Sequence, residues 1–438
     1  MFLRRPDRLI PRQYRDLLML RRFRRLLPAL LASDLGDGMS VVAVAWLAVR
    51  IAPPGGSGPV LGIALAAYSL PGAVGALLFG RWVRRLPARR LLCANSTLRA
   101  VFLGCVPLAS AGGLLDPVCY TVLLAASSLL HAWGGAAKYA LVAELVPEEE
   151  RLAANALLST SGWASTIAGP ALAGLLAAAV GPAWIIGLDA LSFAVLALGT
   201  GLLGGPPAAP SAGRAPGQPV GRAWQLLRRR PELLGLLAVT WFLNVCWGPV
   251  EVALPLFVKG DLGAGAGMLG LYWAVFGAGA IAGALAVGAL RRLPLWPVVL
   301  GIVAGHGVIL LPFALDAPAV VSLGAFTLGG VIYGPYSALC LSLFQNRTPE
   351  GWLTTILAFR SAVLLTAAPL GAALGGPLSA AIGARNTLAV AGLGMVLVAA
   401  IAGWVLVVGR RRPAAGVPER HTEPSPLRGQ AEREASAR

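Results

Sequence analysis

Long apolar runs alternate with short polar segments along the whole chain. Many of these runs exceed the roughly 18 residues that indicate a membrane-spanning helix. The six spans predicted for the first half are Pro28–Ile51, Pro59–Phe79, Leu91–Leu114, Val118–Val142, Leu152–Val180 and Pro182–Leu203. The six predicted for the second half are Leu233–Val258, Gly267–Leu290, Trp296–Leu315, Pro318–Phe344, Leu353–Ile382 and Thr387–Val408. We therefore predict an all-α membrane protein with twelve transmembrane helices in two six-helix bundles.

The polar segments divide the chain into five parts: a basic N-terminal segment (1–26), a first bundle (27–204), a linker (205–231), a second bundle (232–408) and a tail (409–438). The linker begins with a stretch dense in proline and glycine, which cannot build a packed core. From Val220 to Arg230 it becomes amphipathic, which predicts a short helix on an anionic membrane surface. The tail is charged and proline-rich, so we expect it to be disordered.

Composition agrees with this division, because only 13% of the residues are charged, against about 25% in ordinary soluble domains. The net charge of +17 does not indicate a nucleic-acid partner. Thirty of the 36 lysine and arginine residues fall in segments that the twelve spans would place on one side. Cytoplasmic loops of membrane proteins carry such an excess. We expect a multi-pass protein of the bacterial cytoplasmic membrane, with the lipid bilayer as a partner and both termini in the cytoplasm.

No pattern of an enzyme, a metal site or a cofactor site is present in the sequence. The five cysteines are scattered singly through apolar runs, without metal-ligand spacing. We find no phosphate-binding loop, no HExxH and no plausible Ser-His-Asp set, which argues against ATP-driven transport within this chain.

The two halves share an internal repeat. Arg84-Arg85-Leu86-Pro87 recurs as Arg291-Arg292-Leu293-Pro294 at the equivalent place in the second half. Three glycines, Gly169, Gly174 and Gly181, recur at an offset of 202 as Gly371, Gly376 and Gly383. Parallel halves related by an axis along the membrane normal are an architecture of secondary transporters. The bundles should therefore be pseudo-symmetric.

Three motifs carry a resemblance to a known family. They are Ser33-Asp34-Leu35-Gly36-Asp37-Gly38 in the first span, the stretch from Leu145 to Ala156 with Pro147-Glu148 and Ala154-Asn155-Ala156, and Gly169-Pro170 followed by Gly174. With these motifs, nearly the whole chain resembles the major facilitator superfamily, within it the drug- and siderophore-exporter branch that includes macrolide efflux proteins and the enterobactin exporter. The resemblance implies a monomer that exports an amphipathic small molecule, such as a siderophore, a macrolide or another secondary metabolite. It also implies proton antiport and alternating access.

The loop after the second span departs from the superfamily pattern. Arg84 replaces the acidic residue that would latch the cytoplasmic side, so a latch must use another carboxylate, such as Glu144 or one of Glu148–Glu150. The fourth-span pattern with a buried arginine is also missing, and His131 lies near that place. Residues assigned to gating or helix packing are Gly80, Arg84, Arg85, Arg151, Asn155, Gly169, Pro170, Gly174 and Arg360.

Acidic residues inside the spans are the main candidates for proton coupling or substrate contact, because an ionised carboxylate is expensive in a bilayer. Asp34 and Asp37 are three residues apart and share a helix face. The alternative is that Asp37 only fixes helix packing. Asp189 in the sixth span is a possible ion-pair partner.

Glu251 in the seventh span follows Asn244, Trp247 and the helix-breaking Gly248-Pro249. This arrangement is typical of a midplane site, although an outer-gate role is equally consistent with it. His131 can titrate near neutral pH, but a lone histidine in an apolar helix is more often a core residue. Aromatic residues suited to an amphipathic cavity are Trp133, Trp163, Trp241, Trp247, Tyr333 and Tyr336.

Two other functions are consistent with the sequence. A lysophospholipid transporter or an importer would keep the same fold, and a cavity open sideways to lipid would favour the lipid substrate. A membrane sensor or scaffold would move nothing, and a closed cavity or one without polar lining would favour it.

Overall fold

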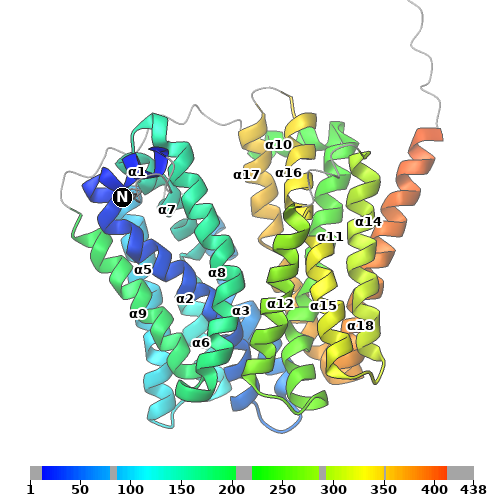
Figure 1. Cartoon of the computed structure of the whole chain (residues 1–438), viewed down its shortest axis with the longest axis horizontal. Coiled ribbons are helices and arrows are strands. Elements are labelled where there is room, and N and C mark those ends of the chain that lie inside the picture. The colour runs from blue at the N-terminus through cyan, green and yellow to red at the C-terminus, as the bar shows by residue number, and fades with distance from the viewer. Residues whose placement is uncertain (1–11, 79–85, 204–219, 286–292, 350–351, 412–438) are drawn as a thin grey trace, which may run out of the picture.

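The computed structural model describes residues 12–78, 86–203, 220–285, 293–349 and 352–411 (Figure 1). Helices of the first half are α1 (Arg12–Met19), α2 (Arg21–Ile51), α3 (Ser57–Leu78), α5 (Ala88–Ala111), α6 (Pro117–Ser128), α7 (His131–Leu145), η2 (Glu148–Glu150), α8 (Arg151–Val180) and α9 (Pro182–Gly201). Those of the second half are α10 (Val220–Arg229), α11 (Pro231–Leu256), η3 (Phe257–Asp261), α12 (Ala266–Leu285), α14 (Leu295–Leu310), η4 (Leu311–Ala314), α15 (Ala319–Tyr333), α16 (Tyr336–Arg347), α17 (Leu353–Leu364) and α18 (Ala367–Arg411).

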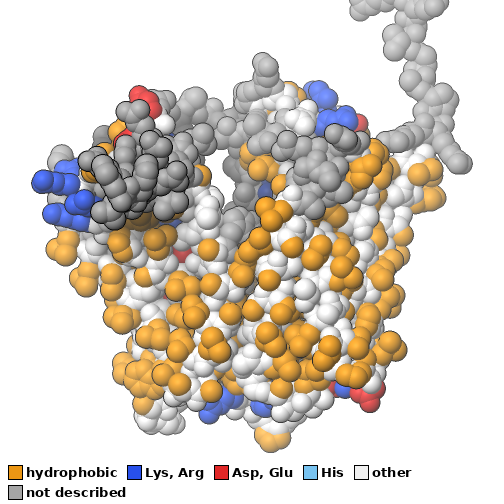
Figure 2. Space-filling model, in the orientation of Figure 1, with side chains coloured by type: hydrophobic (Ala, Val, Ile, Leu, Met, Phe, Trp, Pro, Cys, Tyr) orange, Lys and Arg blue, Asp and Glu red, His pale blue; other side chains and the backbone are white. Residues whose placement is uncertain are grey.

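The all-α membrane fold is confirmed. Within the described residues, ten helical segments are long and apolar enough to cross a membrane. One of them, Phe359–Val408, contains a break at Gly383, and α3 is not among the ten. The count of twelve therefore stays a prediction. Figure 2 shows apolar side chains covering the middle of the visible face, with charged side chains gathered near its two ends.

Three predicted spans are each divided into two helices, and one of them is Leu353–Ile382, which becomes α17 and the first part of α18 with a turn at residues 365–366. The predicted span Val118–Val142 becomes α6 and α7, which are separated by a turn at residues 129–130. The span Pro318–Phe344 becomes α15 and α16, separated by a turn at Gly334-Pro335. The breaks after α6 and after α15 lie at similar places in the two halves, whereas the break between α17 and α18 has no counterpart in the continuous helix α8.

Small residues hold the helices close within each half. Gly38 of α2 lies against the backbone of Ser165 and Gly169 in α8. In the second half, Gly248 of α11 lies against Gly371 of α18. A Cβ atom at any of these glycines would meet backbone, so close approach requires glycine there. The repeated glycines Gly169 and Gly371 thus make equivalent contacts.

The next repeated glycines join the two halves. Gly174 of α8 packs on Gly270 of α12, and Gly376 of α18 packs on Gly58 of α3. The helix pairs α8–α12 and α3–α18 are the main contacts between the halves. Lys259 adds a hydrogen bond of 3.0 Å to the carbonyl of Val49.

The halves meet at one end of the molecule and separate at the other. In Figure 1 the N-terminus, α10 and the start of α17 lie at the upper end, whereas α2–α3 and α11–α12 connect at the lower end. The contacts between the halves involve the beginnings of α3 and α12, hence the lower end. Figure 2 shows the surface hollowed between the halves near the upper end.

Gly181 and Gly383, the last pair of the repeat, share one backbone conformation. Their φ and ψ angles are 77° and 158° for Gly181 and 82° and 164° for Gly383. A positive φ strains any residue with a Cβ atom. Gly383 interrupts α18, just as Gly181 separates α8 from α9.

The amphipathic segment of the linker forms α10, but its apolar side chains do not all face a membrane surface. Ala223 and Leu227 are buried, and α10 lies on α11 and α17. Trp224 reaches Phe359 with ring centroids 6.3 Å apart, and Arg228 stacks over Trp224. Ala223 and Leu227 therefore pack on the second bundle, while the placement of α10 on an anionic membrane surface stays a prediction.

Candidate functional site

A cavity of about 760 Å³ lies between the two halves. Its wall contains α2 and α8 from the first half and α11, α12, α14, α15 and α16 from the second. Residues of the first half in this wall are Val41, Thr166, Ile167 and Pro170. Polar and aromatic residues of the second half in it are Asn244, Trp247, Glu251, Trp273, Phe276, His306, Tyr333 and Ser337. The remaining lining is small or aliphatic, which gives a largely apolar cavity with a few polar groups.

Aromatic rings form one side of this cavity. The ring centroid of Trp247 lies 5.5 Å from that of Phe276, 6.2 Å from that of Trp273 and 5.0 Å from that of His306. Tyr333 continues the group at 6.1 Å from Phe276. Such edge and tilted arrangements are the favoured geometries of aromatic pairs. The group presents flat apolar surface to any occupant.

Glu251 is the only charged residue among the described residues that line the cavity. It lies one helical turn after Trp247 on α11 and is half-buried. Asn244 lines the same wall and donates to the carbonyl of Thr240 at 2.7 Å. Two residues predicted for the site, Glu251 and Asn244, thus lie together in the cavity wall, whereas the predicted acids of the first half do not line it.

His306 contributes another titratable group to the cavity wall. Its Nδ1 lies 3.3 Å from the carbonyl oxygen of Gly329. A carbonyl only accepts hydrogen bonds, so Nδ1 carries the proton. Within the described part of the chain, its Nε2 is buried without a partner.

The other predicted residues meet in a second place, inside the first half, which we call the Arg99 cluster (Asp37, Tyr68, Arg99, His131 and Asp189). The Arg99 side chain is 1% exposed and donates to the carboxylate of Asp37. It also donates to the Tyr68 hydroxyl at 2.6 Å and lies 2.5 Å from Nδ1 of His131. A nitrogen that accepts from a guanidinium carries no proton of its own, so this ring nitrogen is a poor proton carrier.

Asp189 of α9 completes the cluster from the far side. Its carboxylate is fully buried and lies 3.9 Å from the Arg99 guanidinium. The Ser40 hydroxyl donates to it at 2.6 Å, and Ser192 lies at 3.4 Å. One guanidinium therefore faces two carboxylates, of which Asp37 is 36% exposed and Asp189 is fully buried.

Asp34 takes part in a separate ion pair. Its carboxylate lies 2.5 Å from Nζ of Lys138 on α7. Asp34 and Asp37 share a helix side as expected, but each has its own cation. Arg360 of α17 is different, because its guanidinium stacks on Phe344 and its Nε is buried without a hydrogen-bond partner among the described residues.

The residues predicted for gating divide into two groups. Gly169, Pro170 and Gly174 lie where α8 meets α2 and α12. Arg151 donates to the carbonyl of Ala143 at 3.1 Å, and Asn155 is exposed. Gly80, Arg84 and Arg85 lie outside the described residues, as do parts of the N-terminal segment, the linker and the tail (1–11, 205–219 and 412–438).

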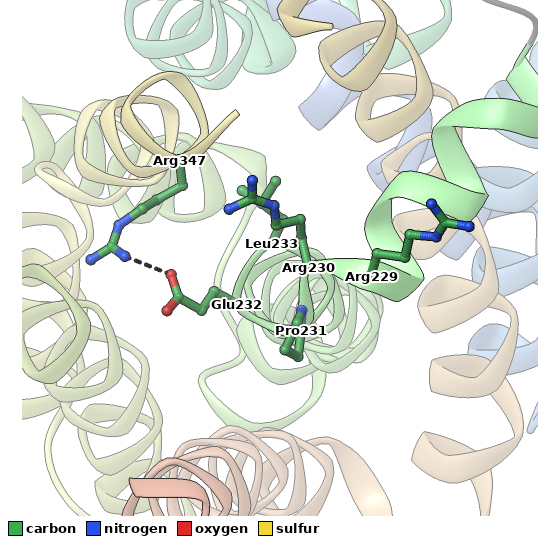
Figure 3. A pocket seen from close by; sticks show the side chains of 6 residues that line it. All are labelled: Arg229, Arg230, Pro231, Glu232, Leu233 and Arg347. Carbon is green, nitrogen blue, oxygen red and sulfur yellow. Dashed lines mark hydrogen bonds and ion pairs between the residues drawn. The ribbon is translucent and has the colours of Figure 1, made fainter. Parts of the chain in front are cut away.

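A smaller cavity of about 340 Å³ lies at the junction of α10 and α11 (Figure 3). Arg347 reaches the Glu232 carboxylate at 2.8 Å, and both side chains are about half exposed. Arg229 points away from that pair in Figure 3. The walls are charged and open to water, which does not suit an amphipathic substrate.

Comparisons with known proteins agree with this architecture. The model of the Major Facilitator Superfamily matches residues 26–363. The multidrug efflux pump Tap of Mycobacterium tuberculosis is 27% identical over 402 residues, covering 86% of this chain and 91% of that protein. The enterobactin exporter EntS of Citrobacter koseri is 28% identical over 354 residues, covering 77% of this chain and 80% of that protein.

Solved structures show the same fold. A bacterial homologue of the human lysosomal transporter Spinster, in an inward-facing and unoccupied conformation, covers 89% of this chain and 99% of its own, with a TM-score of 0.66 at 14% identity. A bacterial homologue of the iron transporter ferroportin, in an inward-facing state, covers 90% of this chain and 100% of its own, with a TM-score of 0.65 at 18% identity. The chain therefore belongs to the major facilitator superfamily and is a multi-pass membrane transporter.

Proposed function

We propose that the protein is a secondary active transporter that exports an amphipathic small molecule. The observation that carries the proposal is the cavity of about 760 Å³ between the halves, which is mainly apolar and has a few polar groups. Ligand sites of proteins have this size and this mixture. A scaffold that moves nothing needs neither the empty volume nor the polar lining.

Alternating access is the proposed route through the membrane. The halves touch at the lower end through glycine contacts and separate at the upper end. The arginine-rich segments favour a cytoplasmic upper end. The described state would then be open to the cytoplasm, and rocking of the halves about the cavity would open the lower end.

Protons are the proposed coupling ion. In the Arg99 cluster one guanidinium faces the carboxylates of Asp37 and Asp189. If both carboxylates are ionised, the three groups carry a net negative charge inside the membrane, which is costly. One proton neutralises the set, so the cluster is suited to carrying a proton. Asp37 is the proposed entry point because it is the exposed member of the pair.

The relatives support export as the direction. A multidrug efflux pump and an enterobactin exporter are each about 27% identical to this chain over most of its length. We therefore place a drug-like compound, a siderophore or another secondary metabolite in the cavity.

The test is transport by the purified protein in proteoliposomes. A macrolide, a catecholate siderophore and ethidium serve as probes, each offered with and without an imposed pH gradient. We expect at least one probe to move against its own gradient when protons flow the other way. If no probe moves, or if movement ignores the pH gradient, the proposal of a proton-coupled exporter is wrong.

A lysophospholipid is a second candidate substrate, favoured by one observation. Ile281 and Leu285 of α12 line the cavity, yet they are 51% and 82% exposed. This apolar strip links the cavity to the surface of the molecule. Transfer of a fluorescent lysophospholipid between leaflets of the same proteoliposomes distinguishes this substrate from the soluble probes.

A further inference from the structure

We infer that the central cavity binds organic cations, which are compounds with one positive charge on an aromatic or apolar body. The inference rests on the proposed function, because it names the substrate class of the same cavity. Three observations support it: the acid in the cavity lining, the aromatic rings beside that acid, and the pairing of Arg99 with Asp37 inside the first half.

The cavity wall contains an acid and no permanently charged base. Among the described lining residues, Glu251 is the one carboxylic acid, and none is a lysine or an arginine. No ion pair of Glu251 is found in the described part of the chain. A carboxylate within an apolar span is costly without a cation beside it. A positively charged occupant would supply that cation.

The aromatic rings lie where the body of such an occupant would rest. Trp247 lies one turn from Glu251, and Trp273, Phe276 and Tyr333 extend the ring surface within the same cavity. The face of an aromatic ring is negative and attracts a cation within about 6 Å of its centroid. Carboxylate and ring faces thus attract the same sign of charge.

An anionic occupant finds no such partner. The Arg99 side chain is 1% exposed and is held by Asp37 and Tyr68. Lys138 is paired with Asp34. A carboxylate or catecholate anion in the cavity would face Glu251 without a positive charge among the described lining residues. The cavity therefore favours a cation over an anionic siderophore.

The test uses two probes of the same shape and opposite charge, tetraphenylphosphonium and tetraphenylborate. Binding of tritiated tetraphenylphosphonium is measured on the purified full chain in detergent. The variants are Glu251→Gln and, as the matched control, Glu232→Gln, which removes an exposed carboxylate outside the cavity. Comparing variants in one detergent cancels unspecific partitioning of the probe.

We expect Glu251→Gln to weaken phosphonium binding roughly tenfold, Glu232→Gln to leave it unchanged, and tetraphenylborate not to displace the phosphonium. Equal binding by wild type and Glu251→Gln, or displacement by the borate as effective as by unlabelled phosphonium, would overturn the inference. If Glu251→Gln does not fold, the two probes on the wild type alone still decide the sign of the charge.

Binding without a gradient separates this inference from the exporter proposal. If phosphonium binds through Glu251 but no probe is moved in proteoliposomes, the cavity assignment stands and the exporter proposal falls. If a neutral amphiphile is exported while Glu251→Gln binds phosphonium as tightly as the wild type, the exporter proposal stands and the cation inference is wrong.

Discussion

Arg99 is the residue on which the charges of the first half converge. It is fully buried, and Asp37, Tyr68, His131 and Asp189 surround it. Removing one partner of a buried ion pair costs about 3–5 kcal/mol, because the other charge is left alone. We expect Arg99→Met to lower the thermal unfolding temperature of the detergent-solubilised protein strongly.

A triple variant, which removes the carboxylates of Asp37 and Asp189 together with Arg99, serves as the comparison. In Arg99→Met with Asp37→Asn and Asp189→Asn no uncompensated charge remains at the cluster, so much of the lost stability should return. If the triple variant is no more stable than Arg99→Met alone, the ionic account of the cluster is wrong and Arg99 acts through packing.

The Arg99 cluster shows that candidate site residues can be selected from the sequence, whereas their contact partners cannot. Asp34, Asp37 and Glu251 could be selected from the sequence, because any acid in an apolar span is a candidate. Their individual partners could not be assigned, since sequence spacing does not determine which helices touch. Trp273 and Phe276 were missed because the sequence of an apolar run does not tell which of its aromatic residues will face a cavity. His131 was placed near a missing arginine, and the structure brings it to Arg99 instead.

The helix pairs α8–α12 and α3–α18 close one end of the molecule. A Cβ atom at Gly270 would lie 2.6 Å from the carbonyl oxygen of Pro170, so the backbones must separate if alanine is introduced. Overpacking of this kind costs about 1–3 kcal/mol. That is enough to shift a two-state equilibrium roughly tenfold. We expect Gly270→Ala to favour the state in which the lower end is open.

Spin labels at Leu114 and Leu315, which are exposed in connections of opposite halves, report this shift as a longer interlabel distance. Gly162→Ala on α8 is the control, because its Cβ would meet nothing within 4 Å. An unchanged distance distribution in Gly270→Ala would mean that these glycines do not determine closure.

Equivalent helix positions in the two halves could be predicted from the sequence where the internal repeat is present. The offset of 202 pointed to equivalent positions, and the contacts of Gly169 and Gly371 as well as the backbone at Gly181 and Gly383 agree. The turn at residues 129–130 had no such signal, since it falls on two leucines. Breaks of this kind depend on tertiary packing, which overrides local propensity.

The orientation of the whole molecule in the membrane is a prediction from its charge. We expect a cysteine at position 228, in place of Arg228 on α10, to be protected from a membrane-impermeant maleimide in intact cells. A cysteine in place of Asp116, between α5 and α6, should be labelled. The test uses a background without the five native cysteines. Labelling at position 228 with protection at 116 would reverse the assignment.

The central claim is that proton flow through the Arg99 cluster drives export, and Asp37→Asn tests it most directly. The variant keeps the shape of the side chain and removes its titration. It breaks the ion pair with Arg99, but Asp189 at 3.9 Å leaves that cation a partner, so folding should survive with a moderate loss of stability. The measurement is proton movement in proteoliposomes with a pH-sensitive dye, using the probe that the wild type transports. We expect the probe to move protons in the wild type and not in Asp37→Asn, while probe binding persists. Normal gradient-driven transport by Asp37→Asn would remove Asp37 from the mechanism, and the same result for Glu251→Gln would contradict proton coupling and favour a uniporter.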